Sequence, residues 1–263
     1  NKISKWVHLE TENKNDWHAD PFITKIKNKN YLLTEYFIYK KNKGVISAQE
    51  IKINKNKIEL GKRMIILENN FHLSYPFTFE KNGRTYMIPE NNKNGCIIYE
   101  LSTNSYNNEI KCKLIRKILK GHCVDPTLIT YKGIDYLFIS YFENSSDQVL
   151  KCYFSKDIIN EKLKEHPTSP IIVDHTLGRS AGRIIEIDNK IIRPSQQNIN
   201  SYGEAVHFSE LFLSKQFITM TKLSDIINIP INKSDYIKTH HLENKNEFTA
   251  IDYVLRKKIF KFL

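Results

Sequence analysis

Residues 124–141 read VDPTLITYKGIDYLFISY, and the rest of the chain repeats the pattern of this stretch. An Asp-Pro step opens a short apolar run with the composition of a strand. The Lys132–Gly133 pair then reverses the chain, because glycine supplies the positive φ that tight hairpin turns require. An aromatic-rich run follows over residues 134–141. The stretch therefore predicts an antiparallel β-hairpin.

The hairpin recurs along the chain at a nearly constant interval. Four further hairpins are predicted at residues 20–36, 75–90, 183–193 and 241–253. Their equivalent positions are Pro21, Pro76, Pro126, Gly182 and His241, which are 55, 50, 56 and 59 residues apart. The units also hold further strand-like runs, roughly four strands in each, which is typical of a β-propeller blade.

This repeat predicts an all-β fold, a five-bladed β-propeller with about four antiparallel strands per blade. The blades start near residues 20, 75, 125, 182 and 241, and residues 1–263 are expected to form a single domain. Little sequence follows the fifth hairpin, whereas Trp6–Leu9 is a strand-like run ahead of the first. Because a propeller avoids an open edge, we expect this N-terminal strand to complete the fifth blade and close the ring.

The chain has a formal net charge of +11, but its lysines are spread over Lys-Asn turns. This distribution favours a solvated basic surface, with an anionic ligand such as a sugar phosphate, an acidic glycan or a membrane surface as the functional alternative. A nucleic-acid partner is not expected, because the sequence holds no RNP, zinc-finger or recognition-helix pattern. No run of 18 apolar residues exists, so a transmembrane segment is not expected either.

The four cysteines give an indication of the compartment. Cys96, Cys112, Cys123 and Cys152 form no CxxC pair and have no histidines at zinc-finger spacing. Free buried thiols in a reducing compartment are therefore favoured over disulfides. We expect a cytoplasmic protein, with peripheral attachment to a membrane as an open alternative.

A ligand site is expected at the mouth of the central channel, where the inner strands of propeller blades begin and their side chains converge. The candidate catalytic residues are Asp20, Asp125 and Glu90. The candidate substrate-binding residues lie at the strand starts, beside them or on the return strands: Trp17, His18, Glu35, His72, Tyr75, Glu143, Arg179, Arg183, Gln196, His240 and His241.

Each of these residue types also has a structural interpretation. An aspartate before proline commonly caps a turn, and Arg179 or Arg183 could form a surface salt bridge instead of binding carboxylate or phosphate. For His240 and His241 a structural role is favoured over metal ligation, because no pattern of supporting residues is visible. No metal or cofactor is therefore expected.

A family resemblance rests on four motifs: FHLSYPF at 71–77, YMIPE at 86–90, VDPTL at 124–128 and AGR at 181–183. With these motifs the chain resembles the propeller domain at the N-terminus of plant glucosamine inositolphosphorylceramide transferases. Similar domains occur in bacterial proteins tied to surface-polysaccharide synthesis. More distantly, the chain resembles the five-bladed propellers of glycoside hydrolase families 43 and 32.

The hydrolase resemblance implies three acidic roles. Asp20 matches the aspartate that acts as base or nucleophile, and Asp125 matches the one that tunes the pKa and holds the sugar. The general acid has no counterpart, because the fourth blade starts with Ser180-Ala181-Gly182-Arg183, although a hydrolase needs a proton donor for the leaving oxygen. Glu90, Glu143 or Glu204 could substitute for it.

Three functions follow from the residues and the resemblance. The first is glycosyl transfer in surface glycan or glycolipid synthesis, with Asp20 as base and the arginines on phosphate. The second is glycoside hydrolysis with an unrecognised acid. The third is non-catalytic glycan binding in the service of a fused or separate catalytic domain. An enzymatic role is favoured, with a carbohydrate or sugar-phosphate ligand.

Overall fold

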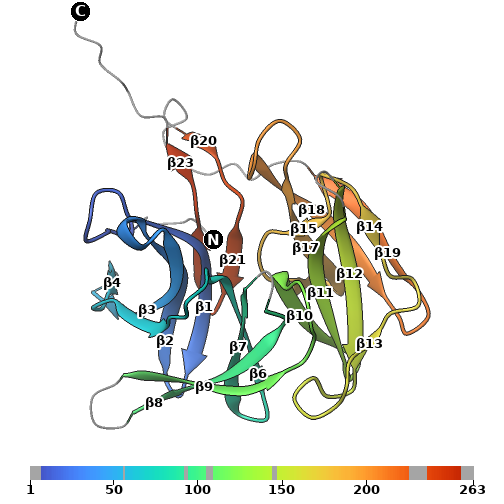
Figure 1. Ribbon diagram of the computed structural model, residues 1–263, viewed down its shortest axis with the longest axis horizontal. Helices are drawn as coiled ribbons and strands as arrows, with labels where there is room; N and C mark the ends of the chain where they lie inside the picture. The colour runs from blue at the N-terminus through green and yellow to red at the C-terminus, as the bar shows by residue number, and fades with distance from the viewer. Residues whose placement is uncertain are drawn as a thin grey trace, which may run out of the picture.

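The computed structural model describes residues 7–55, 57–91, 94–104, 109–143, 147–224 and 236–255. Over these ranges the chain forms an all-β propeller of antiparallel sheets, arranged around a centre toward which the strands β1, β6 and β10 turn (Figure 1). In the described part of the chain, no helix is long and apolar enough to cross a membrane.

Four sheets of blade size follow one another along the chain. The first holds β1 (Trp17–Ile26), β2 (Lys29–Ile38), β3 (Lys43–Asn54), β4 (Lys57–Leu60) and β5 (Met64–Leu67). The second holds β6 (Ser74–Lys81), β7 (Arg84–Glu90), β8 (Ile97–Thr103) and β9 (Ile110–Lys117). The third holds β10 (Val124–Tyr131), β11 (Ile134–Glu143), β12 (Asp147–Ser155), β13 (Lys164–Glu165) and β14 (Ile172–Val173). The fourth holds β15 (Arg179–Ser180), β16 (Ile185–Ile187), β17 (Lys190–Gln197), β18 (Ala205–Leu213) and β19 (Ile218–Ser224).

The prediction of five four-stranded blades is wrong in its last unit. Among the described residues this unit consists of two two-stranded ladders, the hairpin of β21 (Leu242–Lys245) with β22 (Phe248–Ile251), and β20 (Tyr236–Lys238) paired with β23 (Val254–Leu255). The predicted hairpin is therefore present, and its strands β21 and β22 contact β1 (Figure 1). Over residues 236–255, which the structure describes, no sheet extends outward from this hairpin as it does in the four larger units.

Val7–Leu9, the described part of the predicted N-terminal closing strand, form no strand. Trp6 lies outside the described residues, and Val7, His8 and Leu9 have no ladder hydrogen bonds. Instead, Leu9 packs on the apolar cluster of Ile23, Leu32 and Phe248, and the ring of His8 contacts the hydroxyl of Tyr253. The segment therefore meets the last unit through side chains, and the amide of Asp16 closes a turn onto the carbonyl of Asn13 before β1.

The repeated proline motif produces the same backbone irregularity in three blades. Asp20, Tyr75 and Asp125, each followed by proline, have φ values of 49°, 43° and 46°. In each case the register shifts at this point, between β1 and β2, β6 and β7, and β10 and β11. Proline has no N–H for the ladder and is tolerated at such bulges. The motif thus marks a kink where each inner strand begins.

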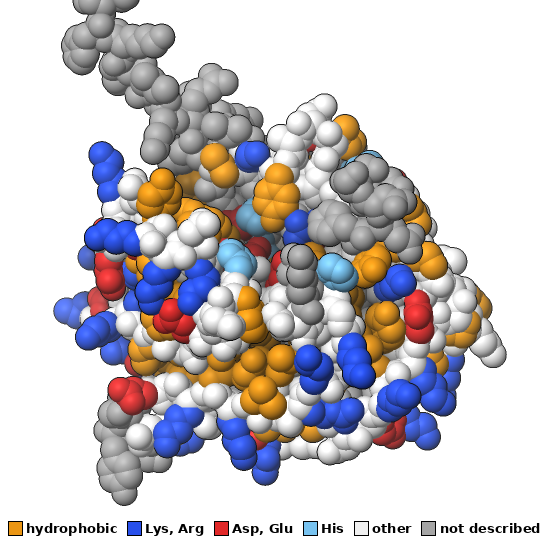
Figure 2. Space-filling model, viewed as in Figure 1, with side chains coloured by type: hydrophobic (Ala, Val, Ile, Leu, Met, Phe, Trp, Pro, Cys, Tyr) orange, Lys and Arg blue, Asp and Glu red, His pale blue; other side chains and the backbone are white. Residues whose placement is uncertain are grey.

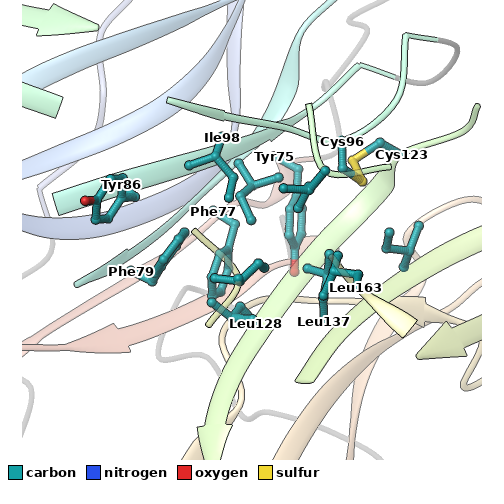
Figure 3. Close-up of a cluster of buried hydrophobic side chains, with 14 of the residues drawn as sticks. Tyr75, Phe77, Phe79, Tyr86, Cys96, Ile98, Cys123, Leu128, Leu137 and Leu163 are labelled. Carbon is teal, nitrogen blue, oxygen red and sulfur yellow. A yellow bond between two sulfur atoms is a disulfide. The ribbon is translucent and has the colours of Figure 1, made fainter. Parts of the chain in front are cut away.

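Figure 3 shows a cluster of buried hydrophobic side chains that includes Tyr75 and Phe77 of the inner strand β6. Phe22, Tyr75 and Phe77 are fully buried and meet edge to face. The hydroxyl of Tyr75 bonds Thr127 at 2.9 Å and accepts a hydrogen bond from the amide of Gly182 at 3.0 Å. A side chain at Gly182 could not fit, because a Cβ atom there would lie 1.9 Å from the carbonyl oxygen of Leu242.

The expectation of four free thiols is wrong for one pair. Cys96 and Cys123 form a disulfide, with their Cα atoms 5.2 Å apart, beside the aromatic core (Figure 3). Cys112 and Cys152 are free, as predicted. The cysteines therefore give no support to a reducing compartment.

Replacing Cys123 by serine is expected to lower the free energy of unfolding by about 3 kcal/mol, because the crosslink limits the freedom of the unfolded chain. The bridged residues are 27 positions apart. Urea unfolding of the oxidised protein measures the effect. Reductant should lower the stability of the wild type to that of the variant and leave the variant unchanged. A wild type insensitive to reductant would contradict the prediction.

Candidate functional site

Ionisable side chains from three parts of the chain gather where the kinked inner strand of the first blade meets the last unit. We call this group, Asp20, Glu35, His72, His240 and Asp252, the mouth cluster. Figure 2 shows histidine and carboxylate side chains in a hollow near the centre of one face. Asp20 stands at the kink of β1 and Glu35 on β2 beside it, while His240 and Asp252 flank the hairpin of the last unit.

The central contacts of the mouth cluster join the first blade to the last unit. The ring of His240 lies between two carboxylates, with Nε2 3.4 Å from Asp20 Oδ1 and Nδ1 3.1 Å from Asp252 Oδ2. Asp252 Oδ1 also accepts the backbone amides of His240 and His241, at 3.2 and 3.0 Å. The carboxylate of Asp252 therefore fixes both the ring and the backbone of the histidine pair.

The charges of this part of the cluster follow from burial and pairing. Burial alone would lower the pKa of His240, but the carboxylates of Asp252 and Asp20 raise it well above its usual value. Against the opposing effect of burial, His240 and His241 lower the pKa of Asp252 to about 2. The ring of His240 thus lies between two acids, an arrangement that can both donate to and accept from the hydroxyl groups of a ligand.

Glu35 and His72 form a second pair on the same face. Their side chains approach to 3.1 Å between Nε2 and Oε1, and His72 Nδ1 accepts the amide of Gly44. Burial raises the pKa of Glu35, and the hydrogen bond to Glu35 raises the pKa of His72. Because the Glu35 carboxyl is buried and the His72 side chain is partly exposed, the imidazole is the group of this pair that a ligand can reach.

The second predicted catalytic aspartate, Asp125, is engaged by an arginine. Arg179 donates from Nε and Nη2 to the two oxygens of Asp125, both at 2.7 Å. Glu90 lies nearby, with Oε2 3.9 Å from Arg179 Nη2. Burial and the Asp125 carboxylate raise the pKa of Glu90 well above its usual range. The guanidinium also lies 5.3 Å from the centre of the Tyr202 ring, whose residue is 56% exposed.

Acidic side chains also accept hydrogen bonds from backbone amides at the kinks of the inner strands. The amide of Asp20 donates to Asp252 Oδ2 at 3.2 Å, and that of Asp125 donates to Glu90 Oε2 at 3.1 Å. The amide of Tyr75 donates to Asp20 Oδ2 at 3.2 Å. Each bulge thus leaves an amide that a carboxylate accepts, and these acids have a structural role whatever they bind.

Three predicted site residues lie in the interior. Tyr75 is part of the aromatic core. Arg183 donates to Glu243 Oε1 at 3.0 Å and to the carbonyl of Thr78 at 2.6 Å. Gln196 is fully buried and donates to the carbonyl of Ser180 at 2.8 Å. The structure does not bring these side chains into the mouth cluster.

Two further predicted residues face a different space. Trp17 and His18 line a cavity of about 380 Å³ between the first blade, the N-terminal segment and the last hairpin. His18 Nδ1 lies 2.7 Å from Thr34 Oγ1, and burial lowers the pKa of His18 to about 4.

His241 is fully buried beside Asp20, and burial lowers its pKa. Glu143 ends β11, and its side chain lies outside the described part of the structure.

Sequence reasoning missed Asp252 and Tyr202. Asp252 follows the return strand of the last hairpin, the position that singled out Glu35 and Glu90 in other units, so the repeat itself could have indicated it. Tyr202 lies in the loop between β17 and β18 and meets the ring of His240 at 5.3 Å between centroids. No repeat or motif marks a loop position of this kind.

Comparison with sequence families gives one match over most of the chain. The family model for the N-terminal region of glucosamine inositolphosphorylceramide transferase 1 matches residues 6–247. The transferase of this name from Arabidopsis thaliana is 31% identical over 159 residues, covering 58% of this chain and 20% of the relative. The one from Oryza sativa subsp. japonica is 31% identical over 147 residues, covering 54% and 19%. The chain spans about a fifth of these relatives.

Solved structures show the same fold at low sequence identity. Zg3597, a family 117 glycoside hydrolase from Zobellia galactanivorans, has a TM-score of 0.60 at 11% identity, over 86% of this chain and 76% of that one. A GH43_1 enzyme from Xanthomonas citri has a TM-score of 0.56 at 10% identity, over 88% and 79%. At these identities the likeness concerns the fold alone.

Proposed function

The chain belongs to the family of the N-terminal region of glucosamine inositolphosphorylceramide transferase 1, and from that premise we propose that it is a carbohydrate-active domain that takes part in glycosyl transfer. Its proposed ligand is the sugar part of a donor or acceptor, bound at the mouth cluster. Residues 1–263 are proposed to act as one domain, and the glycan or glycolipid acceptor is the proposed wider partner.

The observation that carries this proposal is the composition of the mouth cluster. Asp20 and Asp252 present carboxylate oxygens and His240 presents ring nitrogens, which match the donors and acceptors of sugar hydroxyl groups. The exposed ring of Tyr202 beside His240 offers a flat apolar surface for the face of a pyranose. A ligand pocket commonly combines such a surface with a few fixed polar groups.

The arginines support sugar binding more than they support binding of a diphosphate. Arg179 is paired with Asp125, and Arg183 with Glu243. Bidentate phosphate binding needs a guanidinium whose two N–H groups point toward the ligand. In Arg179 these N–H groups are instead engaged with a carboxylate, and in Arg183 with a carboxylate and the carbonyl of Thr78. On this basis we assign the domain the recognition of the sugar, with the transfer chemistry completed by a fused or separate catalytic domain.

Glycoside hydrolysis is the second candidate, and one observation favours it. Burial and the Asp125 carboxylate raise the pKa of Glu90 well above its usual range, which is the direction of shift that a general acid needs. Against this, the Glu90 oxygen Oε2 accepts the amide of Asp125.

Replacing Asp20 by asparagine is expected to weaken sugar binding at least tenfold, because a hydrogen bond to a charged group contributes about 1.5–3 kcal/mol. Calorimetric titration with glucosamine, N-acetylglucosamine, a uronic acid and their nucleotide conjugates measures the effect. Asparagine keeps an oxygen for the Tyr75 amide, so the variant should stay folded. Glu186→Gln, an exposed position on β16, should bind like the wild type.

Each result of this titration decides something. Binding that Asp20→Asn leaves unchanged, or no binding of any sugar by the folded wild type, would contradict the mouth as a sugar site. Release of a reducing sugar from an oligosaccharide, lost in Glu90→Gln, would support hydrolysis instead of binding in the service of transfer.

A further inference from the structure

The contact between the first blade and the last unit has the composition of a metal site. Ligand atoms of Asp20, His240 and Asp252 all lie within 4.8 Å of one another. We propose that these three residues bind a divalent transition-metal cation, with Zn²⁺ as the representative ion. The inference concerns a cation and does not rest on the proposed sugar site, although both use Asp20.

The distances are close to those of a metal coordination shell. Bonds of about 2.0–2.2 Å in a tetrahedral zinc site place neighbouring ligand atoms about 3.3–3.5 Å apart. The His240 Nε2 atom is 3.4 Å from Asp20 Oδ1, and its Nδ1 atom is 3.1 Å from Asp252 Oδ2. These two contacts use opposite nitrogens of the His240 ring, but one ring nitrogen and one oxygen of each carboxylate lie within 4.8 Å of one another. A cation held by these three atoms would displace any proton on that nitrogen and draw the three side chains closer together.

A buried histidine without a hydrogen bond points to the same place. His241 is fully buried, and neither ring nitrogen has a hydrogen-bond partner. Its Nδ1 atom lies 3.6 Å from Asp20 Oδ1, the oxygen that also faces His240. An orphaned buried nitrogen is costly. A cation at Asp20 would give it a favourable electrostatic partner, and after a small shift a ligand bond.

The ligand types select among cations. Imidazole nitrogen suits Zn²⁺ and other transition metals, whereas Ca²⁺ and Mg²⁺ prefer sites made of oxygen alone. Among the residues that the structure describes, ligand atoms of three converge, and the side chain of His240 remains 17% exposed. Such a site leaves coordination positions for water or a hydroxyl of a ligand, as in catalytic zinc sites with three protein ligands.

The positions of the ligands predict an effect on stability. Asp20 belongs to β1, whereas His240 and Asp252 flank the hairpin of β21 and β22. A cation would join these segments, which are more than 200 residues apart in sequence and form no common ladder in the described chain. Because the cation would bind only the native arrangement, it should raise the melting temperature, with a stabilisation that grows with the logarithm of its concentration above Kd.

The test is a titration of the chelator-treated full chain with ZnCl2, MnCl2, CaCl2 and MgCl2, without sugar, followed by calorimetry and by thermal unfolding. One equivalent of Zn²⁺ or Mn²⁺ should bind and raise the melting temperature. His240→Ala should weaken Zn²⁺ binding by about tenfold or more. Asp252→Asn should do the same while keeping an oxygen for the amides of His240 and His241.

His175→Ala is the matched control, because His175 is an exposed histidine in a turn outside the cluster. It should bind Zn²⁺ like the wild type and have the same increase in melting temperature. Absence of Zn²⁺ and Mn²⁺ binding by the folded wild type would overturn the proposal. Zn²⁺ binding that both cluster variants retain would also overturn it, as would binding of Ca²⁺ alone. If the wild type bound sugar but no metal, the metal proposal would be wrong and the sugar proposal would be unaffected.

Discussion

Replacing Arg179 by alanine is expected to lower the free energy of unfolding by about 3–5 kcal/mol, the effect of removing one partner of a buried ion pair. The guanidinium donates two hydrogen bonds of 2.7 Å to Asp125, which is 1% exposed. The carboxyl of Glu90 lies 3.9 Å from the same guanidinium. Without Arg179, two acids would remain buried together with no cation between them. Urea unfolding followed by circular dichroism measures the loss.

A double variant separates the pair from other effects of the substitution. Asp125→Asn combined with Arg179→Met removes both charges and is expected to regain much of the lost stability, because neutral replacements of buried pairs are often well tolerated. The control is the exposed pair of Lys190 and Glu210, where Lys190→Ala should cost less than about 1 kcal/mol. If Arg179→Ala cost no more than this control, Arg179 would be available to a ligand.

Short-range patterns predicted most of the fold. The hairpins at Asp20, Tyr75 and Asp125 are encoded locally, by a proline step, a turn and two apolar runs, so their positions were correct. For the last unit, the prediction of the hairpin was correct and the prediction of further strands was wrong. A hairpin is encoded by local sequence, whereas the outer strands of a blade also depend on chain outside the hairpin. The pairing of Cys96 with Cys123 could not be read from spacing either, since spacing alone does not fix connectivity.

The sequence indicated which residues lie near one another, but it did not indicate which of their side chains are buried. Strand starts and return strands correctly indicated Asp20, Glu35 and His240 as neighbours. The same rule also selected Arg183 and Gln196, whose side chains are instead engaged with Glu243 and with the carbonyl of Ser180. A sequence repeat gives the blade to which a residue belongs, while burial decides between a ligand site and an internal ion pair.

Replacing Glu243 by alanine is expected to lower the free energy of unfolding by about 3–5 kcal/mol, since the largely buried guanidinium of Arg183 would lose its counter-ion. Glu243 is fully buried, and its Oε1 atom accepts from Arg183 at 3.0 Å and from the amide of Ile23 at 3.3 Å. Arg183 in turn donates to the carbonyl of Thr78 on β6. These bonds connect the last unit to the first two blades.

The chain contains a matched control for this prediction. Lys245 and Glu80 join the same two strands, β21 and β6, at 3.1 Å, but Glu80 has a 53% exposed side chain. Glu80→Ala should therefore cost less than about 1 kcal/mol. A large loss for Glu243→Ala with a small one for Glu80→Ala would mean that the buried pair of Glu243 and Arg183 stabilises the position of the last unit. Equal losses would mean that the surface contacts hold it.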